Sequence, residues 1–243
     1  MTTPVDRIIE EIAQRDPRFP RQIRGASEDE IAALERDAGG VAPPDHRDFL
    51  RRMGHSSDWL VPEAGDFTID ALSTYYDSGL PPPPPGHWMI ACGIGDAPAD
   101  IHLRDEGQGV WRVVSFPPAP RRNFAAFART HLRPVSGSLP QLLAVAAFRQ
   151  LRLPALPWRA VLEGQGLNQR YLSRLEPVFV AEGLHPTWYS DDWRRTYDDT
   201  DLIAIVAELP DCPCVVIINA RCAESLRDLT ARVRAVLGPG RVG

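Results

Sequence analysis

The sequence predicts an α+β fold in which helices near the N-terminus pack on an antiparallel sheet. Two helix-forming stretches follow one another within residues 27–53. Three short strand-forming runs come later, at 88–94, 101–103 and 110–115, and turn-forming residues separate them. Connections this short favour antiparallel pairing, because a parallel crossover needs about a dozen residues or more.

The first of the two helices is predicted over residues 27–38 and begins at a capping box. Ser27 and Glu30 stand three residues apart, so each side chain can bond to the backbone N–H of the other. Ile31 and Leu34 then fall on one face of the helical period. We expect this face to be buried.

The second helix is predicted over residues 44–53. Pro44 suits a first helical turn, because its missing N–H would have had no partner there. Phe49, Leu50 and Met53 recur at helical spacing and are expected to point inward. The glycines at 39 and 40 separate this helix from the one before it.

A polar loop and a third helix are expected next. His55, Ser56, Ser57 and Asp58 include the residue types of a hydrolytic triad. Neighbours on one loop cannot form the nucleophile–base–orienter geometry among themselves, so we interpret them as a solvated loop. The helix that follows is expected to hold two adjacent aromatic residues and to be capped by an acidic one; these are Tyr75, Tyr76 and Asp70.

The order of these elements resembles that of the SUKH superfamily, which includes a yeast cell-wall synthesis regulator and many bacterial immunity proteins. The later strand runs, and a helix at 124–132, follow in the family's order, and Gly54-His55 stands where the family carries Asn-Gly. The resemblance covers residues 4–132. The matching residues of the opening helices are Glu30, Ile31, Leu34, Glu35, Pro43, Pro44, Phe49 and Leu50.

The hydrophobic pattern resets near residues 153–157, which divides the chain into a SUKH-like domain at 1–153 and a C-terminal part at 158–240. This second part is predicted to run α-β-β-α, either as an extension of the first sheet or as a small domain of its own. Its elements are a helix at 167–181, strands at 202–209 and 215–219, and a helix at 223–237. Both strands are apolar almost throughout, so we expect both faces to be covered.

Composition excludes several classes of function. The formal net charge is −5 and neither half of the chain is basic, so the footprint of a nucleic-acid-binding protein is missing. All 27 basic residues are arginine, which excludes lysine Schiff-base chemistry. No apolar run approaches the length of a membrane span, and no signal peptide is evident, so we expect a cytoplasmic protein.

No metal or cofactor is predicted. Cys212, Cys214 and Cys222 could be combined with His185 as zinc ligands, but a C-x-C spacing without a second pair is a weak signal. In a reducing cytosol the cysteines should be free thiols. The glycines after residue 92 lack the third glycine of the dinucleotide fingerprint, because Pro98 stands in its place.

The polar stretch at 188–201 interleaves acids with aromatic residues and admits three interpretations. Paired carboxylates could serve acid–base chemistry or hold a divalent cation. Aromatic anchors with an acidic rim would instead suit a protein interface. An ordinary exposed loop is the third. Trp59 beside Asp58 has the same composition as Trp193 beside Asp192.

The family resemblance implies a non-enzymatic protein-binding module, most specifically an immunity protein that neutralises a cognate polymorphic toxin. The toxin is expected to present a basic nuclease or deaminase domain. A regulatory scaffold of the cell-wall-regulator kind is the alternative, followed by an enzyme that uses the 188–201 carboxylates. The residues expected to bind the partner are Asp58, Trp59, Tyr75, Tyr76, Asp191, Asp192, Trp193, Asp198 and Asp199.

Overall fold

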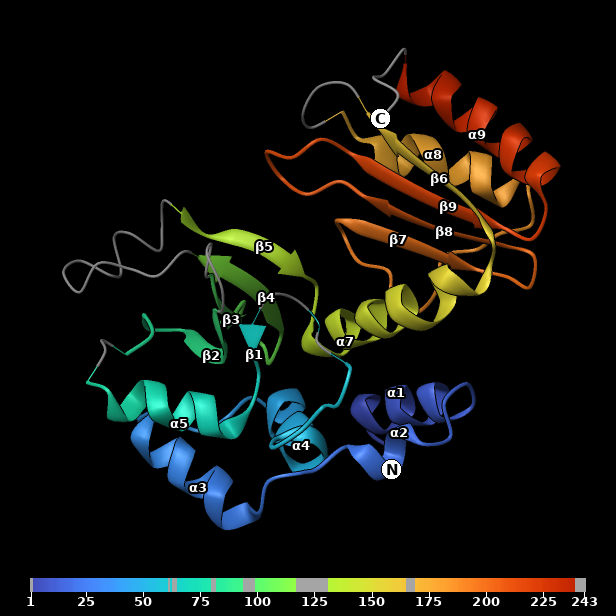
Figure 1. Cartoon of the computed structure of the whole chain (residues 1–243). Coiled ribbons are helices and arrows are strands. Elements are labelled where there is room, and N and C mark those ends of the chain that lie inside the picture. The colour runs from blue at the N-terminus through green and yellow to red at the C-terminus, as the bar shows by residue number, and fades with distance from the viewer. Residues whose placement is uncertain are drawn as a thin grey trace. The chain divides into compact units, whose positions relative to one another are not determined.

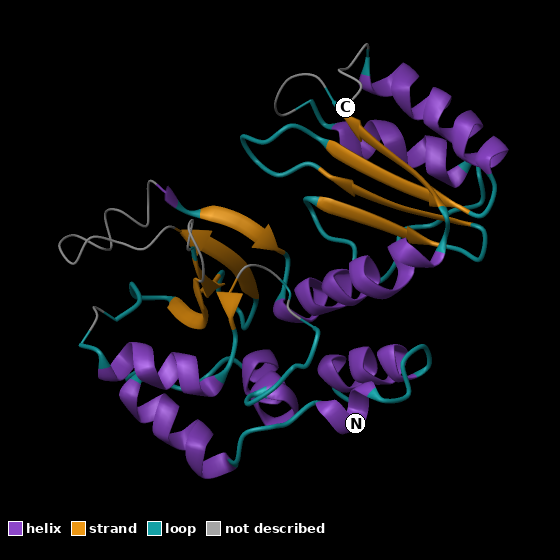
Figure 2. Cartoon of the chain, viewed as in Figure 1, coloured by secondary structure: helices purple, strands orange, loops and turns teal. Residues whose placement is uncertain are grey.

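The chain divides into two units, Met1–Ala146 and Ala147–Gly243. This computed structural model describes residues 2–60, 62, 65–79, 82–93, 99–116, 131–164 and 169–238. Each unit combines helices with its own antiparallel sheet, which confirms the α+β class (Figures 1 and 2). The reset in hydrophobic pattern at 153–157 lies further along the chain than this division.

Unit 1 places helices ahead of most of its sheet, as the sequence predicts. Within the described residues its sheet has five strands in the order β1-β2-β3-β4-β5, and every neighbouring pair is antiparallel. The helix expected at 124–132 falls almost entirely outside the described residues. The elements are α1 (Pro4–Ala13), α2 (Phe19–Gln22), α3 (Glu28–Asp37), α4 (Pro44–Met53), β1 (Gly65–Asp66), α5 (Ile69–Asp77), β2 (His87–Gly93), β3 (Asp100–Asp105), β4 (Trp111–Phe116), β5 (Arg133–Ser136) and α7 (Leu139–Ala147).

The helices of unit 1 begin where side-chain oxygens can satisfy the free N–H groups of the first turn. The capping box of α3 is confirmed: the Ser27 N–H donates to the Glu30 carboxylate at 2.8 Å, and the Glu30 N–H donates to Ser27 Oγ at 3.3 Å. Thr3 caps α1 in the same way. The helix α5 begins two residues earlier than predicted, because Thr68 rather than Asp70 is its cap.

The core of unit 1 lies between these helices and the sheet. From α4, the fully buried His46 accepts a hydrogen bond from the indole N–H of Trp88 on β2, at 2.8 Å. Phe49 of α4 packs edge-on against Phe67. Leu50 is also fully buried. The apolar face predicted for the second helix is therefore the face that packs against the sheet.

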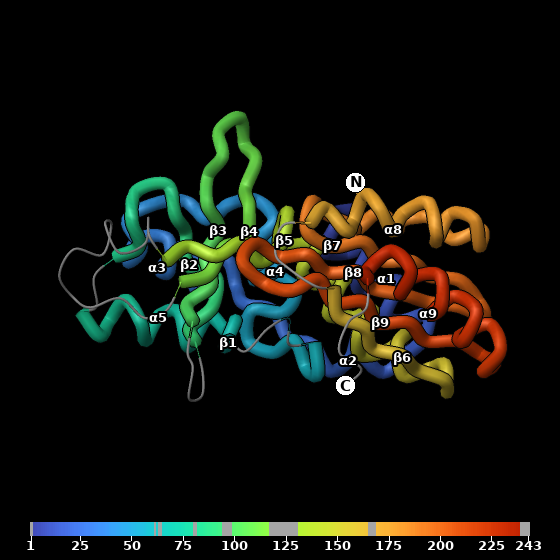
Figure 3. Tube along the Cα trace, turned by 90° about the horizontal axis from the view of Figure 1, so that it is seen from above, coloured from blue at the N-terminus to red at the C-terminus, as the bar shows by residue number. Residues whose placement is uncertain are grey.

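Unit 2 consists of four described strands and two helices on one face of the sheet (Figures 1 and 3). The strand order is β6-β9-β8-β7, all antiparallel, so β6 and β7 are the two edges. The predicted α-β-β-α elements are present, and two further strands, β6 and β7, complete the sheet. The elements are a π-helical turn at Phe148–Arg152, a 3-10 turn at Leu153–Ala155, β6 (Trp158–Glu163), α8 (Tyr171–Val180), β7 (Arg194–Asp198), β8 (Leu202–Ala207), β9 (Val215–Ala220) and α9 (Ala223–Leu237).

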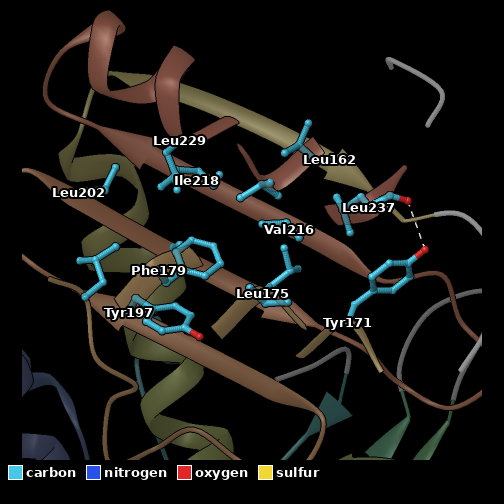
Figure 4. Close-up of a cluster of buried hydrophobic side chains, with 14 of the residues drawn as sticks. Leu162, Tyr171, Leu175, Phe179, Tyr197, Leu202, Val216, Ile218, Leu229 and Leu237 are labelled. Atoms are coloured by element: carbon cyan, nitrogen blue, oxygen red, sulfur yellow. Dashed lines mark hydrogen bonds between the residues drawn. The ribbon is translucent and has the colours of Figure 1, made fainter. Parts of the chain in front are cut away.

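An apolar cluster joins the sheet of unit 2 to α8 and α9 (Figure 4). Phe179 of α8 stacks on Tyr197 of β7 with ring centroids 4.4 Å apart, and both side chains are fully buried. The hydroxyl of Tyr171 donates to the carbonyl of Leu237 at 3.3 Å, which links the start of α8 to the end of α9. The space between the sheet and the helices α8 and α9 is therefore filled by hydrophobic and aromatic side chains.

Candidate functional site

The loop 54–60, which follows α4, is held in place by a short segment of backbone at residues 24–26. Arg24 and Ser56 exchange two backbone hydrogen bonds, Arg24 N–H to Ser56 O at 2.9 Å and Ser56 N–H to Arg24 O at 3.0 Å. Gly54 allows the close approach, because a Cβ there would lie 3.0 Å from the Ala26 Cβ. The loop is therefore positioned by main-chain contacts, independent of its polar side chains.

A surface hollow of about 290 Å³ lies beside this loop. It is lined by polar groups from the loop, together with the last residue of α4 and the residues before α5. Two of its lining groups are carboxylates, Asp58 and Asp66, and a third ionisable group is His55. The full lining is Met53, His55, Ser56, Ser57, Asp58, Gly65, Asp66, Phe67 and Thr68.

His55 is held between two carboxylates that come from different helices. Its Nε2 lies 3.0 Å from Glu30 Oε1 on α3, and its Nδ1 lies 3.3 Å from Asp70 Oδ2 on α5. Both contacts are satisfied together only when both ring nitrogens carry a proton. Hydrogen bonds from Ser27 and, after them, the nearby His55 lower the pKa of Glu30, so its carboxylate is held in the charged form.

Asp58 and Trp59 of this loop have different surroundings, although the sequence groups them as one binding element. Asp58 is exposed and has a left-handed backbone, with φ of 52°. Trp59 packs against Phe19 of α2 with ring centroids 5.1 Å apart, and its indole N–H donates to Asp16 at 3.3 Å. The carboxylate therefore faces solvent, whereas the indole supports the fold.

Tyr75 and Tyr76 are partly buried on α5 and lie edge to face, with centroids 5.3 Å apart. Burial, together with the charge of Asp100, raises the pKa of Tyr75 to about 12. Burial raises the pKa of the neighbouring Cys92 thiol to about 12 as well, and its Sγ contacts the Ala71 carbonyl. These groups stay neutral at physiological pH, so the pair contributes aromatic surface and no charge.

The 188–201 stretch contains a strand, β7, where the sequence suggests a loop. Asp191 is only 7% exposed, and its carboxylate accepts hydrogen bonds from the backbone N–H groups of Trp193 at 2.9 Å and Arg194 at 2.8 Å. It therefore shapes the turn that leads into β7. Its burial removes Asp191 from the carboxylates that are exposed to a partner.

The remaining acids of this stretch are partly neutralised within the unit. Asp198 accepts from Arg152 Nε at 2.8 Å, and both side chains are 19% exposed. Asp201 pairs with Arg221 at 2.5 Å at an exposed position. Asp192 and Asp199 are exposed, and Trp193 is partly buried. Besides Asp201, the stretch thus offers exposed carboxylates at Asp192 and Asp199, and Trp193 lies next to Asp192.

These arrangements do not form a metal centre within the part of the chain that the structure describes. No group of three or more His, Cys, Asp or Glu side chains there could hold a metal ion. Cys212 and Cys222 are exposed, whereas Cys214 is buried, and all three are free thiols. Sequence reasoning missed the contacts of Glu30 and Asp70 with His55, because the three residues come from separate elements.

Comparison with known proteins does not assign a family to this fold and site. No family model, curated protein or solved structure matches the chain. None of the helices in the described ranges is long and apolar enough to cross a membrane. What the structure defines is an α+β protein of two units with an acidic hollow on the surface of the first.

Proposed function

We propose that this chain is a non-enzymatic protein-binding module, and specifically a SUKH-type bacterial immunity protein that neutralises a cognate toxin. The acidic hollow beside loop 54–60 is the observation that supports this function. It gathers Asp58 and Asp66 on its wall, with the His55–Glu30–Asp70 group at the same loop. A guanidinium or ammonium group of a partner protein matches that charge.

The charge of the hollow fits the kind of toxin that the resemblance suggests. A toxin that cleaves or modifies nucleic acid must hold phosphates, so its active surface is basic. An acidic inhibitor surface speeds encounter with such a partner through long-range attraction. One cationic side chain of the toxin seated in the hollow would then set the orientation of the complex.

The exposed part of the 188–201 stretch is a second surface of the same composition. Asp192 and Asp199 supply charge there, and Trp193 supplies a partly buried aromatic ring. Its internal contacts weigh against the enzymatic alternative, because Asp191 and Asp198 are already engaged by backbone N–H groups and by Arg152. A regulatory scaffold would use the same acidic surface and differ only in its partner.

The test is binding to the protein encoded by the adjacent gene, with association and dissociation rates measured at two ionic strengths. Asp58→Asn and Asp70→Asn together should slow association by about an order of magnitude and flatten its salt dependence. Asparagine tolerates the left-handed backbone at 58, so the loop should keep its shape. Asp77→Asn, at the opposite end of α5, is the matched control and should change neither rate.

Two outcomes would count against the proposal. Failure of the wild-type protein to bind or protect against its neighbour's product would remove the immunity function. Unchanged rates in the Asp58 and Asp70 variants would place the interface outside the hollow. Trp59→Ala is a poor probe, since that indole packs on Phe19 and its loss would disturb the fold.

A further inference from the structure

Among the strands that the structure describes, β6 is an open sheet edge, unlike the other edge strands. In unit 1, β1 has two residues, and β5 has four and contains a proline, so neither offers a long template. In unit 2, β7 is covered by the segment before it, through Thr187 N–H to Thr196 O and Asp191 N–H to Arg194 O. The strand β6 has six residues, and its outer side pairs with none of the described residues (Figure 3).

The register of β6 shows which of its backbone groups face outward. Gly164 N–H donates to Cys214 O at 2.8 Å, and β6 continues from this pair in antiparallel register with β9. In such a ladder, alternate residues direct their N–H and C=O toward the neighbour. Ala160 and Leu162 therefore bond to β9. The backbone groups that point away from the sheet belong to Arg159, Val161 and Glu163.

The same three residues also present their side chains on the face of the sheet opposite α8 and α9. Leu162 is buried in the cluster beneath α8 and α9, and Ala160 packs against that cluster, so their odd-numbered neighbours point to the other face. Val161 is 50% exposed, and Arg159 and Glu163 are both exposed. Neither charge forms an ion pair with any described residue. This edge therefore carries an arginine, a valine and a glutamate in that order.

When two copies of this strand run in opposite directions, the arginine of each lies opposite the glutamate of the other. We propose that β6 is the docking site for a second copy of this chain, in an antiparallel β6–β6 pair centred on Val161. Two-fold symmetry then brings Arg159 opposite Glu163 of the second copy, and Glu163 opposite its Arg159. Val161 meets its own equivalent. Every outward N–H and C=O of the three residues gains a partner, and the two sheets of unit 2 become one continuous sheet.

The side chains of β6 on the face of the sheet covered by α8 and α9 also fit this pairing. Trp158, which is 51% exposed, falls opposite Gly164 of the second copy in this register. Gly164 has no side chain of its own. The Tyr171 ring lies over this position, and a Cβ there would be 2.7 Å from that ring. An aromatic residue across from an edge glycine is a stabilising cross-strand pair. The pairing therefore covers the two most exposed apolar side chains of β6.

Charged residues on an edge strand can also serve to prevent pairing, and this alternative gives a different result. Sedimentation velocity and light scattering on the full chain, over a concentration series, distinguish the two. We expect a dimer. Arg159→Glu places a carboxylate opposite Glu163 of the second copy. Glu163→Arg places a guanidinium opposite Arg159 of the second copy, so each change creates a repulsive pair. Each single change should raise the dimer dissociation constant by about tenfold, and the double exchange should restore it.

Two further variants test the register itself. Val161→Pro removes only an outward N–H, so the circular dichroism spectrum should be kept while the dimer is lost. Val161→Cys should crosslink two copies on oxidation, because Cα atoms about 5.5 Å apart in a hydrogen-bonded pair lie within disulfide range. This variant is made with Cys212→Ser and Cys222→Ser. Val180→Cys, exposed on α8, is the matched control and should stay uncrosslinked.

A wild-type chain that is monomeric at every concentration would overturn the proposal and assign the charges of β6 to preventing association. A dimer that all of these variants leave intact, with no crosslink at Val161, would also overturn it, since the interface would then lie elsewhere.

Discussion

The two units are stabilised in different ways, although both combine helices with an antiparallel sheet. Unit 1 starts its helices α1, α3 and α5 with side-chain oxygens and buries two histidines, His46 and His102, at full depth. Unit 2 begins α8 at Arg170 with a left-handed backbone and no side-chain cap, and its helical cluster is apolar and aromatic. The core of unit 1 thus holds two buried histidines, whereas the cluster beneath α8 and α9 in unit 2 holds none.

The histidines show what this difference means for the core of unit 1. His46 accepts from the Trp88 indole, so the ring nitrogen concerned carries no proton. His102 stacks on Phe116 with centroids 4.3 Å apart. Burial lowers the pKa of each histidine to about 3. A charge on either ring would be enclosed without a counterion among the described residues.

The largest expected effect is in the packed core of unit 2. Phe179→Ala removes a fully buried ring from its stack with Tyr197 and should cost about 3–5 kcal/mol of stability. Hydrogen exchange followed by mass spectrometry would show the loss in α8, β7 and β8 while unit 1 keeps its protection. Val180→Ala, at the exposed neighbour, should change stability by less than about 0.5 kcal/mol. Equal loss of protection in both units would mean that they unfold together.

The next effect is a pH dependence confined to unit 1. Above pH 6.5, His46 and His102 are neutral in the folded and unfolded chain alike. Below pH 6.5 the unfolded chain binds protons that the folded chain accepts only near pH 3, so stability falls as the pH drops through this window. Each pKa unit corresponds to about 1.4 kcal/mol. Asp45 and Asp100 act in the opposite direction at pH values above 3.8, because burial raises their pKa.

Hydrogen exchange at pH 7 and pH 5 separates the two units in this respect. Unit 1 should lose protection and unit 2 should keep it, because the only histidine after residue 147 is the exposed His185. His102→Leu should reduce the pH dependence of unit 1, whereas His185→Gln should leave it unchanged. Acid sensitivity of equal size in both units would contradict the role given to the buried histidines.

The smallest effect concerns the caps. The helix α9 begins at Cys222, whose Sγ accepts the Ser225 N–H at 3.5 Å, in place of the oxygen caps of unit 1. A hydroxyl is a stronger acceptor at this position, so Cys222→Ser should stabilise unit 2 by about 0.5 kcal/mol. The thermal midpoint would report it, with Cys212→Ser as the control that caps no helix. A lower midpoint in Cys222→Ser would show that the thiol contributes through packing.

Local sequence signals located most elements of both units. The Ser27–Glu30 capping box and Pro44 placed α3 and α4 to within a residue, because the groups that satisfy a helix end lie within one turn of it. The strands β2, β3 and β4 of unit 1, and β8 and β9 of unit 2, were likewise located by short apolar runs. In each case the information that fixes the element lies inside it.

The strands β6 and β7 were missed for the opposite reason. Arg159 and Glu163 in β6, and the charged residues at both ends of β7, obscure the alternation that marks a half-buried strand. These segments are strands because β8 and β9 provide a paired edge on each side. The acids of β7 illustrate the same dependence, since Asp198 is balanced by Arg152 from a segment 46 residues away.

Local sequence signals predicted the α+β class, the capped start of α3 and the apolar strands, because each rests on contacts between near neighbours in the chain. The long-range contacts of the fold place His55 between Glu30 and Asp70, bury Asp191 in a turn and leave β6 at an edge of the described sheet. Those features depend on which distant segments meet. Contacts across 15 to 25 residues leave no periodic trace in the sequence.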